Sequence, residues 1–153
     1  MDVLEMYQYN IHVSHLSREE VEHELLIRNM FSEPEEHLST MRRRLKDRIK
    51  WEIESKTITV SDVRREITEE IFIIRTNLKV IEDSFDQTKG DNWQRQKLKS
   101  VIIHYGIRAF LLSKAAKAER YVSGIEALQA HVIRLIENYY PEFKFSSLTQ
   151  FCI

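Results

Sequence analysis

The chain has 153 residues, with 23 Lys and Arg against 24 Asp and Glu, which gives a formal net charge of −1. This balance excludes a global attraction to nucleic acid or to an acidic membrane surface, so any such binding depends on local clusters of charge. The 3 glycines and 2 prolines are too few for the turns of an all-β fold. Apolar residues at helical spacing predict an all-α protein instead.

Two helices are predicted near the start of the chain. Ser17 followed by Glu20 is a capping-box pattern, so the first helix is expected to begin there and to end near Asn29. A second capping-box pattern, with a proline in its first turn, lies at residues 32–35 and predicts a helix that ends near Ser55.

Three longer helices are predicted after Ser61. The first has an apolar stripe with alternating steps of four and three residues: Val63, Ile67, Ile71, Ile74, Leu78, Ile81 and Phe85. The same rhythm returns at Leu98, Val101, Tyr105, Ala109 and Leu112, and again at Ile125, Leu128, Val132, Leu135 and Tyr139. Asp91 and Gln94 are expected to start the middle helix, Ser123-Gly124 predicts a break or kink, and Pro141 ends the last helix. Such stripes must be buried against each other or against a partner.

The predicted architecture is therefore a small two-helix unit followed by a bundle of three longer helices. Residues 1–55 form the first part, residues 61–140 the bundle, and residues 141–153 an apolar C-terminal tail. The tail either folds back onto the bundle or docks on a partner through Phe143, Phe145, Leu148 and Phe151.

Catalytic, cofactor-binding and metal-ligating motifs are not found in the sequence. His12 and His15 have no carboxylate or thiolate at ligand spacing, and His104 lies in an apolar helix without an identifiable partner for general-base work. A charged turn is typical of surface ion pairs: Arg64, Arg65, Glu66, Glu69 and Glu70. We expect a protein that is not an enzyme and needs no cofactor or metal.

The second helix carries a basic cluster around a single acid, Asp47. Its members are Arg42, Arg43, Arg44, Lys46, Arg48 and Lys50. Phosphates could neutralise such a cluster and release counterions, which would give nucleic-acid binding. A solvated helix surface is the favoured interpretation, and an acidic protein partner is a third.

The stripe of the third helix also allows two interpretations. Its spacing suits the core of a monomer, and it equally suits a coiled-coil seam between chains, with self-association through Ile67, Ile71, Ile74, Leu78, Ile81 and Phe85. Phe72, Ile73 and Val80 lie outside the stripe and give this helix more apolar surface than one neighbouring helix would cover.

The first two helices resemble a SAP-type motif. The matching residues are Leu16, Val21, Glu24, Leu25 and Arg28, then Leu38, Met41, Arg42 and Leu45. The turn between the helices lacks the glycine of that family. The resemblance implies DNA binding through the basic second helix.

Residues 15–50 also resemble the N-terminal region of Gag-type polyproteins from arthropod LTR retroelements and of host genes derived from them. The shared stretches are Leu16-Ser17-Arg18-Glu19-Glu20, Glu24-Leu25, Arg28 and Met41-Arg42-Arg43-Arg44-Leu45. This resemblance implies a non-enzymatic assembly module.

The predicted function is protein–protein interaction, above all self-association, with nucleic-acid binding through the basic cluster as the alternative. No membrane partner is expected, because no signal peptide or membrane span is visible in the sequence. No small-molecule substrate is expected, because the sequence contains no catalytic motif. The single cysteine, Cys152, excludes an intrachain disulfide and fits a reducing compartment, nuclear or cytoplasmic.

Overall fold

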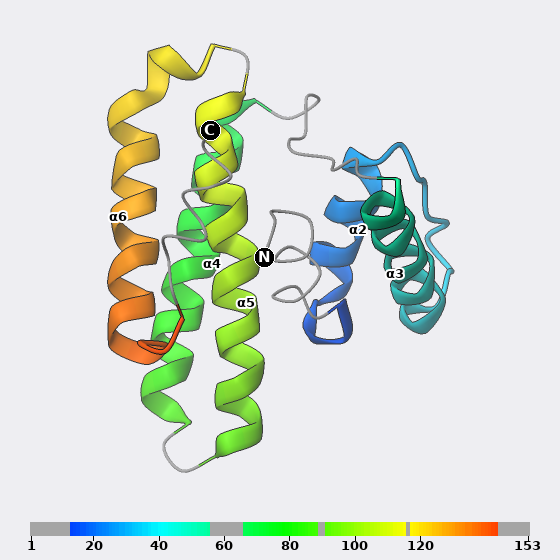
Figure 1. Ribbon diagram of the computed structural model, residues 1–153, viewed down its shortest axis with the longest axis horizontal. Coiled ribbons are helices and arrows are strands. Elements are labelled where there is room, and N and C mark those ends of the chain that lie inside the picture. Colours follow the sequence, from blue (N-terminus) through cyan, green and yellow to red (C-terminus); the bar gives the residue numbers. More distant parts are fainter. Residues whose placement is uncertain (1–12, 56–65, 89–90, 116, 144–153) are drawn as a thin grey trace. The chain divides into compact units, whose positions relative to one another are not determined.

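The computed structural model describes residues 13–55, 66–88, 91–115 and 117–143. Every regular element in these ranges is a helix (Figure 1), which confirms the predicted all-α class. The chain divides into two compact units, Met1–Arg64 (unit 1) and Arg65–Ile153 (unit 2). Of the predicted tail, Phe143 is half-buried, and Phe145, Leu148 and Phe151 lie outside the described residues.

Unit 1 is built on a pair of packed helices, α2 (Arg18–Ile27) and α3 (Leu38–Glu54), with a short 3-10 turn, η1 (Val13–His15), before them. The predicted capping box is present at the start of α2. The Glu20 amide donates to Ser17 Oγ at 3.3 Å, and the Ser17 amide donates to Glu20 Oε1 at 2.6 Å. The core of the unit is formed by Leu16, Val21, Leu25, Met41, Leu45 and Ile49.

The predicted start of the second helix at residues 32–35 is wrong, because α3 begins at Leu38. Two arginines bind the backbone carbonyls of this stretch. Arg18 Nη1 donates to the Glu36 carbonyl at 2.8 Å, and Arg44 Nη2 donates to the Phe31 carbonyl at 2.8 Å. Pro34 also disfavours the helical conformation for the residue before it. The stretch is therefore a side-chain-anchored loop and not a first helical turn.

Unit 2 is a bundle of three long helices, α4 (Ile67–Gln87), α5 (Asn92–Leu111) and α6 (Val122–Tyr139), each packed against the other two (Figure 1). The predicted cap of α5 is confirmed, since Asp91 Oδ1 accepts from the Gln94 amide at 3.1 Å. The predicted end of α6 before Pro141 is also confirmed. The helix expected from Ser61 begins instead at Ile67, and the first stripe residue, Val63, lies outside the described residues.

Helix α5 is the most deeply buried element. Every residue from Ser100 to Leu112 is buried, as its apolar composition predicts. The flanking helices present the predicted stripes to the interior: Ile74, Leu78, Ile81 and Phe85 of α4, and Ile125, Leu128, Val132 and Leu135 of α6, are buried. Tyr139 completes the α6 stripe by stacking on Phe85, with ring centroids 4.4 Å apart.

The interruption between α5 and α6 starts after Leu111 and ends at Val122, just before the predicted break at Ser123-Gly124. Two 3-10 turns, η2 (Leu112–Lys114) and η3 (Ala118–Tyr121), interrupt the chain, and Lys117 between them is left-handed with φ 64°. Gly124 belongs to α6, where a Cβ would lie 3.3 Å from Cδ1 of Ile71. The glycine therefore serves the close approach of α4 and α6.

Candidate functional site

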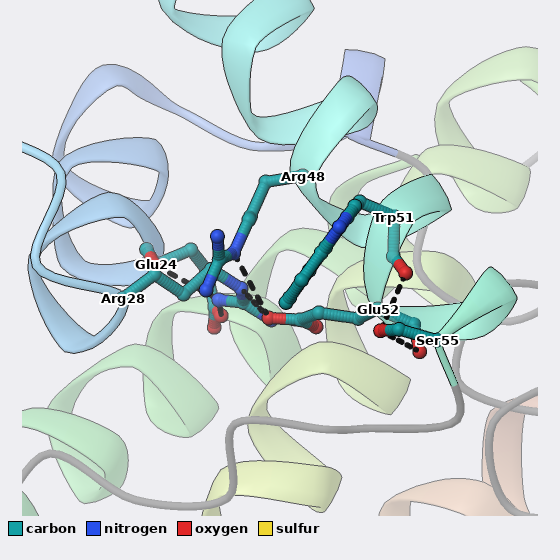
Figure 2. Close-up of polar contacts among 6 residues, drawn as sticks. All are labelled: Glu24, Arg28, Arg48, Trp51, Glu52 and Ser55. Atoms are coloured by element: carbon teal, nitrogen blue, oxygen red, sulfur yellow. Dashed lines mark hydrogen bonds and ion pairs between the residues drawn. The ribbon is translucent and has the colours of Figure 1, made fainter.

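The most buried charges of unit 1 join its two helices. The Arg28 guanidinium is fully buried and forms a bidentate ion pair with Glu52, with Nε 2.8 Å from Oε1 and Nη2 3.3 Å from Oε2. Its Nη1 reaches Glu24 Oε2 at 2.7 Å and the Glu24 carbonyl at 2.8 Å. Both carboxylates are buried as well. Figure 2 shows these side chains converging between α2 and α3.

One side of this ion-pair network reaches the surface. Arg48, which is partly exposed, lies with Nε 3.8 Å from Glu52 Oε1 and with its guanidinium 4.2 Å from the ring centroid of Trp51 (Figure 2). With Arg48 included, the positive charges of two arginines balance the negative charges of Glu24 and Glu52. A charge-balanced, hydrogen-bonded network of this kind fixes how two helices pack.

Unit 2 has a comparable buried pair. Glu70 is buried and accepts from Arg108 Nε at 2.7 Å, with Arg108 Nη2 also in contact. The sequence placed Glu70 among surface ion pairs with Arg64 and Arg65. The surface position is wrong, because Glu70 is buried at a core position of α4 and binds Arg108 of α5, 38 residues away. Arg64 and Arg65 lie outside the described residues.

The predicted basic cluster is divided by the fold. Arg42 donates to the Leu16 carbonyl at 2.6 Å. Arg44 holds both oxygens of Glu36 at 2.8 Å. Together with Arg48, these two cations serve the internal contacts of unit 1.

The other half of the basic cluster faces solvent. Arg43, Lys46 and Lys50 are exposed and follow one another at steps of three and four, so they lie along one face of α3. They have no ion-pair partner among the described residues. Asp47 and Glu54 are exposed on the same face, so its net charge is one positive.

The structure places the predicted self-association residues inside unit 2. Ile67, Ile74, Leu78, Ile81 and Phe85 are buried, and Ile71 is half-buried. A surface for a second copy must therefore lie outside this stripe.

Several large apolar side chains remain exposed on unit 2. Phe72 is 69% and Val80 57% exposed on the outer side of α4. Trp93, in the first turn of α5, is 68% exposed and has Lys97 Nζ 6.0 Å from its ring centroid. Exposed aromatic and apolar side chains of this size are typical of protein-binding surfaces when they gather.

A groove of about 390 Å³ opens where the turn between α5 and α6 meets the start of α6. Buried Ala118 and Ile125 belong to its lining, and half-exposed Val122 lies beside them. Glu119 and Glu126 also line the groove and are exposed, and neither has an ion-pair partner in the described ranges. The groove offers an apolar surface and two carboxylates, which suits an apolar side chain that carries a nearby cation.

Titratable groups near the end of α6 belong to surface pairs. The hydrogen bond to Asp86 Oδ1, 3.0 Å long, raises the pKa of Tyr139 above its usual range. The hydrogen bond from Lys99 Nζ, 2.7 Å long, lowers the pKa of Glu142. Within the described ranges no group of His, Cys, Asp and Glu is arranged to hold a metal ion, and no helix is long and apolar enough to cross a membrane.

The chain matches no protein-family model, no curated protein and no solved structure. The SAP-type and Gag-type resemblances of unit 1 therefore stay predictions. Of the residues that would carry them, Glu24 and Arg28 belong to the buried network, and Arg42 binds the Leu16 carbonyl.

Proposed function

We propose that the chain is a non-enzymatic protein–protein interaction module that associates with copies of itself. One observation carries this proposal: Trp93 stays 68% exposed on a bundle whose stripes are already buried. Leaving an indole exposed costs solubility without adding to the core, so the contribution of Trp93 is expected at a contact with another chain. The Gag-type resemblance of unit 1 points to the same kind of role.

The molar mass of the chain in solution, followed as concentration rises, tests this proposal. Association through exposed side chains predicts a mass that increases with concentration while helicity stays constant, and a melting temperature that rises with concentration because association stabilises the folded state. The single cysteine supports placing this activity in the nucleus or cytoplasm.

Nucleic-acid binding through α3 is the second candidate, favoured by the exposed row of Arg43, Lys46 and Lys50. Three cations neutralise at most three phosphates, so affinity for duplex DNA should fall about 40-fold between about 50 and about 200 mM salt. Six cations would give a fall of about 2,000-fold over the same range. The exposed acids on this face rank this candidate below self-association.

A charge reversal tests the second candidate. Arg43→Glu/Lys46→Glu/Lys50→Glu should abolish any duplex binding measured by fluorescence anisotropy and leave the circular dichroism spectrum unchanged. Arg42→Ala/Arg44→Ala is the matched control, because it removes internal contacts and should lower the melting temperature. If duplex binding survives the triple reversal, α3 is not the nucleic-acid surface.

A further inference from the structure

Trp93 and the groove lie at opposite ends of unit 2. Trp93 is in the first turn of α5, and the residues that line the groove begin just beyond the last turn of α5. The 20 residues of α5 span about 30 Å. Trp93 therefore cannot fill the groove of its own bundle.

The two features are chemically complementary. Trp93 presents an exposed indole with the Lys97 ammonium beside it, at 6.0 Å from the ring centroid. The groove presents an apolar surface at Ala118 and Ile125, with the carboxylates of Glu119 and Glu126 also in its lining. Its volume of about 390 Å³ falls within the range of pockets that enclose a compact apolar group.

From this match we infer that unit 2 associates head to tail: Trp93 of one copy inserts into the groove of the next, and Lys97 pairs with Glu119 and Glu126. This inference rests on the proposed self-association and names its surfaces. Each copy offers one Trp93 and one groove. Two copies that exchange both contacts about a two-fold axis form a closed dimer, and copies that share one contact with each neighbour extend into a ring or a filament.

The outer face of α4 is a weaker surface for the same purpose. Phe72 and Val80 are about 12 Å apart along the helix axis. Exposed Arg75, Thr76 and Lys79 lie between them in the sequence. Two separated side chains do not form a contiguous apolar patch. Phe72→Ala/Val80→Ala is therefore the matched control for loss of exposed apolar surface.

Single-surface variants of the full chain test the inference by sedimentation equilibrium. Trp93→Ala removes the inserted side chain, and Glu119→Lys/Glu126→Lys reverses the carboxylates of the groove. Each should weaken self-association at least about 30-fold, the loss expected for a central aromatic residue. Because Trp93, Glu119 and Glu126 are exposed, circular dichroism should show unchanged helicity. The control Phe72→Ala/Val80→Ala should associate like the wild type.

Mixing the two variants gives the sharper result. Trp93→Ala keeps an intact groove, and Glu119→Lys/Glu126→Lys keeps an intact Trp93, so the mixture should form a 1:1 dimer that grows no further. Failure to form that dimer would overturn head-to-tail pairing. A wild type that associates while Trp93→Ala associates equally well would overturn this inference and leave the proposed function standing. A wild type that stays monomeric would overturn the proposed function itself.

Discussion

Arg28→Met is expected to unfold unit 1. The substitution keeps the length of the side chain but leaves the carboxylates of Glu24 and Glu52 buried without their common cation. Removing one partner of a buried pair costs about 3–5 kcal/mol. A unit of this size has a free energy of unfolding of only a few kcal/mol, at about 0.05–0.15 kcal/mol per residue. The loss therefore approaches the whole stability of the unit.

Hydrogen exchange resolved by peptide mass measures this effect for each unit separately. Amides of α2 and α3 should lose protection in Arg28→Met by far more than those of α4, α5 and α6. Arg43→Met is the matched control, since Arg43 is an exposed cation of unit 1, and it should leave protection unchanged. Adding Glu24→Gln/Glu52→Gln to Arg28→Met removes the unpaired buried carboxylates. The triple variant should therefore regain part of the protection of its α2 and α3 amides against hydrogen exchange. Equal protection in Arg28→Met and the control would show that the network contributes little.

Leu78→Ala is expected to have the largest effect on unit 2. Leu78 is fully buried in the middle of α4, and truncating a leucine in such a position costs about 3–5 kcal/mol because a cavity remains. For a unit of this length the loss corresponds to a fall in melting temperature of about 15–25 °C.

The neighbouring residue supplies the control for Leu78→Ala. Lys79 is exposed and pairs with Asp83 at 3.2 Å on the surface, so Lys79→Ala should change the free energy of unfolding by about 0.5 kcal/mol or less. Calorimetry on both variants makes the comparison. If Leu78→Ala melted like Lys79→Ala but lost self-association, the stripe would be a seam between chains and the core assignment would be wrong.

The sequence predicted the helix caps and the buried stripes, which depend only on residues close to one another along the chain. The capping box of Ser17 and Glu20, and the cap of Asp91 on Gln94, are complete within a few residues. The buried stripes of α4 and α6 follow from a helical period that any window of the sequence contains. Such features do not require knowledge of the tertiary structure.

Features that depend on distant residues were missed. Helix α3 starts only at Leu38 because Arg18, the first residue of the preceding helix α2, binds the loop carbonyls. The pairs of Arg28 with Glu52 and of Arg108 with Glu70 join residues 24 and 38 positions apart. A partial signal was present, because Glu70 lies at the core spacing between Ile67 and Ile74, where a lone carboxylate requires a cation. The sequence does not identify that cation.

The groove likewise could not be predicted. It depends on the left-handed Lys117 and on two short 3-10 turns that bring Ala118 beside Ile125. No glycine or proline lies between the end of α5 at Leu111 and the start of α6 at Val122, so the only turn signal nearby, Gly124, placed the predicted break just inside α6.

Light scattering on the unmodified chain, from low micromolar to several hundred micromolar, tests self-association most directly. Exposed apolar side chains on a completed bundle predict a weight-average mass that climbs above the 18.3 kDa of one chain as concentration rises. A mass that stays at 18.3 kDa throughout that range would contradict self-association.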